Sequence, residues 1–273
     1  MGRRGNPPAL SHLAVPRPAW QFRAKESRLA TIAIYSLKGG VGKTTLAVNL
    51  AWCAATLSAR RTLLWDLDPQ AAATYLLPGG DGAIRDSAHS AFTRQIAPEA
   101  LVRPTAIDRL DLIAADTSLR ALDLTLHALD KKKRLAKLLA SLDKSYERII
   151  LDCPPGLTET TEQVVRAADL ILVPVIPSPL AQRAYEEIGR HFRRRAGTLV
   201  PVHAMVDRRR TLHREAVAAD PDWPVIPMAS GVEAMAARRL PVGAFSSGSP
   251  AAGAFEQLWR GVEARLARLA QAA

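Results

Sequence analysis

A glycine-rich turn between an apolar run and a helical segment constrains this chain more than any other feature. The turn reads Gly39-Gly40-Val41-Gly42-Lys43-Thr44; it follows the β-prone run 31–35 and precedes a predicted helix over 45–58. Glycines let backbone N–H groups approach a phosphate without Cβ clashes, and the N-terminus of the next helix adds the positive end of its dipole. The sequence therefore predicts a strand–turn–helix unit that holds nucleotide phosphates.

Two side chains of this turn carry its expected chemistry. Lys43 is expected to reach the β- and γ-phosphates, and the Thr44 hydroxyl is expected to ligate Mg²⁺. The standard pattern requires glycine at position 37, where this chain has Leu37, and a second lysine, Lys38, stands beside it. The loop is therefore a variant of the standard phosphate-binding turn.

Short β-prone runs alternate with helical segments along the rest of the chain. Strands are expected at 62–65, 110–114, 148–151, 170–175, 198–206 and 223–226, and helices at 117–143, 180–195 and 249–270. This alternation predicts an α/β fold with a doubly wound, mostly parallel sheet and helices on both faces. No apolar run approaches the about 18 residues of a membrane span. We expect one domain over 29–273, preceded by a flexible basic arm over 1–28.

Basic residues are concentrated in two places. Residues 1–28 contain six lysines and arginines and one glutamate, and residues 190–214 contain eight arginines and one aspartate. These two segments therefore account for all of the net charge of +11 that the whole chain carries. Local positive patches are typical of a polyanion partner, DNA or an acidic membrane, although a solvated arginine-rich surface is the alternative. The candidate DNA contacts are Arg193, Arg194, Arg195, Arg208, Arg209 and Arg210.

Three motifs in order carry a family resemblance. Lys38 to Thr45 resembles the deviant Walker A loop of the ParA/MinD ATPases, Leu64 to Gln70 resembles their second motif, and Ile149 to Pro155 resembles their Walker B strand. The resemblance extends over roughly residues 29–270. It implies the P-loop fold and ATP hydrolysis that depends on Mg²⁺.

The resemblance also implies roles for individual residues. Lys43 would act within its own subunit, Lys38 would cross to the partner's nucleotide in an ATP-sandwich homodimer, and Asp66 would orient the attacking water. Thr44 and Asp152 would hold Mg²⁺. Asp68 would support the loop or the metal shell, or would only form a turn. The expected nucleotide-binding residues are Lys38, Gly39, Gly40, Val41, Gly42, Lys43, Thr44 and Thr45, with Met205, Asp207 and Pro227 near the adenine.

The family resemblance leaves the cargo open. We expect a cytoplasmic, nucleoid-associated switch that binds DNA nonspecifically and works with a ParB-like or other cargo-adaptor protein to position a plasmid, a chromosome locus or a protein cluster. Family members often carry Gly-Asn where this chain has Ala71-Ala72, which puts the usual partner-stimulated turnover in question. Two cysteines, Cys53 and Cys153, argue against an iron–sulfur redox role.

The main alternative is a MinD-like membrane switch that uses an amphipathic C-terminal helix. Its apolar stripe comprises Phe255, Leu258, Trp259, Val262, Leu266 and Leu269. A helix docked on the core gives the same stripe. We favour core docking, so a membrane is not an expected partner. A metabolic ATPase with a small substrate is a third class, for which no second catalytic cluster is seen.

Overall fold

The computed structural model describes residues 29–77, 88–93, 95–128 and 133–272, without the side chains of 195–197. The predicted basic arm, 1–28, lies outside the described residues. Residues 129–132, within the helix predicted over 117–143, also lie outside the described residues.

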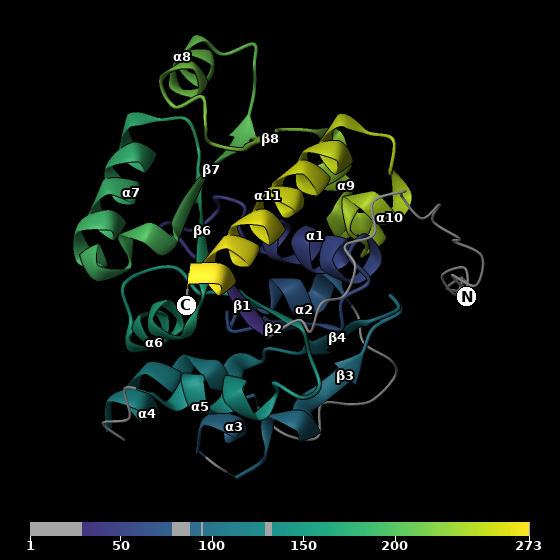
Figure 1. Ribbon diagram of the computed structural model, residues 1–273, viewed down its shortest axis with the longest axis vertical. Coiled ribbons are helices and arrows are strands. Elements are labelled where there is room, and N and C mark those ends of the chain that lie inside the picture. The colour runs from purple at the N-terminus through teal and green to yellow at the C-terminus, as the bar shows by residue number, and fades with distance from the viewer. Residues whose placement is uncertain (1–28, 78–87, 94, 129–132, 273) are drawn as a thin grey trace, which may run out of the picture.

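The described strands form one sheet, which confirms the predicted α/β class (Figure 1). They are β1 (Ala30–Ile34), β2 (Thr62–Asp66), β3 (Val102–Pro104), β4 (Leu110–Ile113), β5 (Arg148–Asp152), β6 (Leu170–Val175), β7 (Leu199–Val206) and β8 (Val225–Pro227). Their order is β3-β4-β2-β5-β1-β6-β7-β8, and every pairing is parallel except that of β3 with β4. The sequence gives no strand signal for β3, because it is three residues long and ends in Pro104 at the sheet edge.

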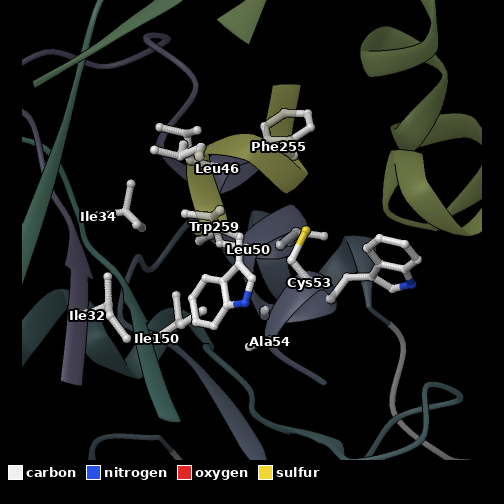
Figure 2. Packing of buried hydrophobic residues seen from close by; sticks show 14 of the residues in the cluster. Ile32, Ile34, Leu46, Leu50, Cys53, Ala54, Ile150, Phe255 and Trp259 are labelled. Atoms are coloured by element: carbon white, nitrogen blue, oxygen red, sulfur yellow. The ribbon is translucent and has the colours of Figure 1, made fainter. Parts of the chain in front are cut away.

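The central strands are continuous apolar runs because helices cover both faces of the sheet. Ile32 and Ile34 of β1 point into one cluster, which contains α1 (Lys43–Thr56) and α11 (Pro250–Ala272). Ala33 belongs to the opposite cluster, with residues from the helices between 90 and 191. Figure 2 shows the first cluster, in which Leu50 of α1 and Trp259 of α11 pack with Ile32, Ile34 and Ile150 of the strands.

The remaining helices are shorter. They are α2 (Ala72–Leu76), α3 (Ser90–Thr93), α4 (Leu122–Ala128), α5 (Arg134–Ser141), α6 (Glu159–Ala167), α7 (Pro179–His191), α8 (Thr211–Ala219), α9 (Ser230–Arg238) and α10 (Val242–Phe245), with 3₁₀ turns at Pro98–Leu101, Thr117–Ala121 and Arg193–Thr198.

The prediction of one helix over 117–143 was wrong, because the chain divides into a 3₁₀ turn, α4 and a separate α5. Contacts with other elements fix the start of α5, so that it does not continue the axis of α4. The Arg134 Nε donates to the Phe92 carbonyl, and the Leu135 amide donates to the Gln163 side chain. The predicted helix over 180–195 also ends earlier, at His191. Helix α6, which the sequence analysis missed, begins with a Thr158–Thr161 capping box.

The C-terminal helix α11 is docked on the core. Phe255, Leu258, Trp259, Val262 and Leu266 are buried, and only Leu269 of the predicted stripe is exposed, at 39%. The Trp259 indole donates to the Ser58 hydroxyl at 2.8 Å, and Glu263 pairs with Arg148 at the start of β5. Core docking is therefore confirmed. Within the described ranges, no helix is long and apolar enough to cross a membrane.

Candidate functional site

The glycine-rich turn forms an open cradle between β1 and α1. Gly40 and Gly42 have φ values of 71° and 93°, a conformation that glycine adopts readily and that is strained for residues with a side chain. A Cβ placed on Gly39 or Gly40 would meet no atom within 4 Å, so the chain leaves space there. Gly42 precedes α1 without a side-chain cap, and the first N–H groups of this helix therefore face that space.

The two lysines of the turn differ in environment. Lys43 is buried, and its Nζ donates to the Lys38 carbonyl at 3.2 Å. Burial lowers the pKa of Lys43, while the charges of Asp152 and Asp68 oppose that shift. The Lys38 side chain is half-buried, and it makes no ion pair or hydrogen bond with any other described residue. Lys43 is thus held within its own loop, whereas the Lys38 ammonium is left available.

Asp152 ends β5 as a buried carboxylate without a hydrogen-bond partner among the described residues. Both oxygens are fully enclosed. Burial raises the pKa of Asp152 well above its usual range, and the carboxylate of Asp66 raises it further, while the charge of Lys43 opposes this. An unpartnered buried carboxylate is costly unless a cation joins it. Carboxylate and hydroxyl oxygens are ligands that suit Mg²⁺, so Asp152 and Thr44 fit the predicted metal.

Asp66 stands directly across the sheet from Asp152, because β2 and β5 pair with these two residues in register. One Asp66 oxygen accepts the Asp68 amide at 3.1 Å, and the other accepts both the amide and the hydroxyl of Thr74, at 2.9 and 2.8 Å. Burial raises the pKa of Asp66 to about 6 despite these bonds. Asp66 thus fixes the path of the chain from β2 into α2.

Asp68 carries the more open carboxylate of this pair. It is half-buried, and its Oδ1 accepts the Gln70 amide at 2.9 Å, which is the turn-forming contact considered from sequence. Its charge also raises the pKa of Lys43, so it lies toward the phosphate loop.

A pocket of about 420 Å³ opens at the C-terminal ends of β7 and β8. It is lined by Val206, Asp207, Arg208, Arg209, Pro227, Met228, Ala229, Ser230 and Glu233. Asp207 and Pro227, two of the three residues expected near the adenine, therefore line one pocket. Met205 does not line this pocket. Its side chain lies beside the phosphate loop instead, 3.5 Å from a Cβ built on Gly42, and its φ is 55°. An adenine contact for Met205 stays a prediction.

Comparison with known proteins identifies the family. A family model described as an AAA domain matches residues 29–196. ParA of Caulobacter vibrioides, a chromosome partitioning protein, is 32% identical over 202 residues, which cover 70% of this chain and 75% of ParA. The chain belongs to the ParA/MinD family of P-loop ATPases.

Other relatives agree with this ParA/MinD assignment. The sporulation initiation inhibitor protein Soj of Bacillus subtilis is 34% identical over 145 residues, which cover 53% of this chain and 57% of Soj. The match thus spans about half the length of Soj and of a second curated ParA. McdA of Cyanothece, solved with ATP, has the same fold, with a TM-score of 0.72, 20% identity and coverage of 88% of this chain and 97% of McdA. Further structures of this fold hold an ATP analogue or ADP, each with magnesium.

The two arginine clusters of this ParA/MinD chain lie at opposite ends of β7. Arg193 and Arg194 are exposed before the strand, and Arg208, Arg209 and Arg210 are exposed after it. An eight-residue strand spans about 26 Å, so the clusters occupy opposite rims of the sheet. The side chain of Arg195 lies outside the described part of the structure.

Sequence reasoning missed several residues of the site. Thr74 holds Asp66 from eight residues away, and no local pattern marks it. Ser230 and Glu233 line the pocket from the first turn of α9. Their position just after the short strand β8 is the one available signal, because ligands bind beyond the carboxyl ends of parallel strands.

Proposed function

We propose that this chain is an ATP-dependent, dimerising ATPase that associates with DNA and serves as a switch that segregates or positions cargo. The observation that carries the proposal is the buried, unpartnered carboxylate of Asp152 beside Lys43 and the Thr44 hydroxyl. This arrangement supports the proposal, because carboxylate and hydroxyl oxygens of the kind that suit Mg²⁺ lie beside the glycine-rich turn. Chromosome partitioning is the function that the name of the Caulobacter relative gives, and we extend it to this chain as part of the proposal.

In the proposed reaction, the loop amides and Lys43 bind the phosphates and neutralise their charge. Thr44 and Asp152 would hold Mg²⁺, which supplies further charge neutralisation when bound. Phosphoryl transfer needs mainly positioning and electrostatic stabilisation, and these residues provide both. The pocket beyond β7 and β8 receives the base.

Asp66 and Asp68 are the two candidates to orient the attacking water. Asp66 is the residue that the family resemblance suggested, but all its described contacts hold the β2–α2 connection. Asp68 has the freer carboxylate. Substituting each with asparagine separates the roles: loss of turnover with unchanged thermal stability identifies the water-orienting residue, and loss of both identifies the residue that maintains the loop.

The Lys38 ammonium is the group that this proposal assigns to a second subunit. Lys38→Ala should bind Mg·ATP as a monomer, whereas the parent should form a dimer with saturating Mg·ATP in light scattering. A Lys38→Ala protein that dimerises as well as the parent would remove Lys38 from the dimer contact.

The experiment that tests the proposal as a whole is calorimetry on Lys43→Ala. This substitution removes the cationic contact to the β- and γ-phosphates, so Mg·ATP binding should be lost. Lys38→Ala is the matched control, because it removes a lysine of the same loop and should retain binding. Equal ATP affinity in Lys43→Ala and the parent contradicts the loop assignment.

The DNA part of the proposal rests on the exposed arginines after β7 and predicts nonspecific, salt-sensitive binding at the nucleoid. A ParB-like or other cargo-adaptor protein would be the partner that stimulates turnover. The membrane alternative loses its main support, because the apolar stripe of α11 is buried, except for Leu269, in the cluster that contains α1. Co-sedimentation with anionic liposomes but no shift of duplex DNA would restore it.

A further inference from the structure

Arg209, in the turn after β7, is held by the carboxylate of Asp207, which lines the pocket. The Arg209 Nε donates to one oxygen of Asp207 and its Nη2 donates to the other, each at 2.9 Å. The Arg209 amide adds a bond to Oδ1 at 3.0 Å. This two-point pairing holds the pKa of Asp207 down at about 2. The guanidinium is thus committed to a carboxylate, although the Arg209 side chain is 89% exposed.

Separate contacts fix the backbone of this turn. The Arg214 Nη1 donates to the carbonyls of Arg208 and Arg209, both at 3.1 Å, and the Asp207 amide donates to the His213 Nδ1 at 3.0 Å. Opening the Asp207–Arg209 pair therefore leaves the turn in place. Only the long Arg209 side chain has to move.

Both members of the pair line the pocket that the proposed function gives to the base. The present inference rests on that function and on the contact of the same turn with DNA. A base in this pocket would place its exocyclic amino group, a hydrogen-bond donor, in competition with Arg209 for the Asp207 oxygens. It would also occupy the space beside the guanidinium.

We propose that Asp207 is a positioning residue that holds Arg209 until a nucleobase enters the pocket, so that nucleotide binding releases an arginine to bind a DNA phosphate. The pocket and the DNA-binding turn would then be coupled by one ion pair. Arg208 has no carboxylate contact among the described residues, so it serves both states equally.

The expected size of the coupling is modest, because exposed ion pairs are weak. A pair of this kind changes an equilibrium by about 2- to 5-fold. Each released arginine should also add one phosphate contact, which steepens the slope of log K against log salt concentration by about 0.9. This slope distinguishes a new phosphate contact from a general change in stability.

The test measures binding of the nucleotide-free protein to a random-sequence duplex over a series of salt concentrations. Asp207→Asn should bind about 2- to 5-fold more tightly than the parent and show the steeper slope. Glu233→Gln is the matched control, because it removes a carboxylate from the same pocket that makes no ion pair with the described residues. It should leave the slope unchanged. In an Arg209→Ala background, Asp207→Asn should have no effect.

The outcomes separate this inference from the proposed function. A parent that binds no DNA even with Mg·ATP at low salt overturns both. A parent that binds DNA, with Asp207→Asn and Glu233→Gln giving the same affinity and slope, overturns the coupling alone. A gain for Asp207→Asn that persists without Arg209 also overturns it, because removal of negative charge alone would then explain the effect.

Discussion

The ion pair between Arg148 and Glu263 should make a large contribution to the docking of α11. Its guanidinium donates to both carboxylate oxygens, at 2.7 and 2.9 Å, and the two side chains are only 6% and 5% exposed. Glu263→Gln removes the charge and leaves the Arg148 guanidinium buried without its counter-charge. Breaking a buried pair from one side costs about 3–5 kcal/mol.

We expect the lower end of that range, about 3 kcal/mol, because glutamine still accepts one hydrogen bond and Arg148 keeps its bond to the Glu147 carbonyl. For a domain of this size, 1 kcal/mol corresponds to roughly 2–4 °C in Tm, so Tm should fall by about 6–12 °C. Thermal unfolding followed by circular dichroism measures this directly.

Glu256→Gln is the control for this prediction. It lies on the same helix and faces Arg260 at 3.8 Å, but in an exposed pair that contributes at most about 0.5 kcal/mol. Equal losses of stability in Glu256→Gln and Glu263→Gln would refute the reasoning. So would a double variant, Arg148→Met with Glu263→Leu, that is less stable than Glu263→Gln, because an apolar pair should recover most of the loss.

Three further predictions concern backbone space and buried charge. Gly243→Ala should cost at least about 1–3 kcal/mol in urea unfolding, because its Cβ would lie 2.2 Å from the Trp52 ring. Ala71→Gly should change stability by less than about 1 kcal/mol, since relief of its left-handed φ of 54° is offset by unfolded-chain entropy, whereas Ala71→Val should destabilise clearly. Burial lowers the pKa of His203, whose Nδ1 is unpartnered, so stability should fall as pH drops below about 6.5, and His203→Gln should reduce that dependence in pH-dependent melts.

The strands other than β3, and the phosphate loop, could be predicted because local sequence determines them. A continuous apolar run such as 170–175 fits only a strand covered on both faces, and glycines with positive φ mark the turn that follows β1. Asp66 and Asp152 could be brought together as well. Both end apolar strands, and the carboxyl ends of parallel strands meet at one edge of the sheet.

The errors came where tertiary contacts override local pattern. The segment 117–143 has helical composition throughout, but contacts from other elements hold Arg134 and Leu135 at the start of a separate helix. The Met205 side chain lies beside the phosphate loop, at Gly42, although the two residues are more than 160 positions apart in the sequence. No periodicity in either segment indicates it.

The candidate site is built from buried charged groups that lower the stability of the protein when no ligand is bound. Lys43 and Asp152 are buried beside each other without an ion pair among the described residues, and Asp66 adds a second buried carboxylate across β2 and β5. Each group is costly to bury with its charge unpaired. In the proposed complex, phosphate oxygens would neutralise Lys43 and a cation would neutralise Asp152. The free energy that the fold loses at this edge would then return as binding energy, while the clusters on both faces of the sheet and the anchored α11 keep the empty protein folded.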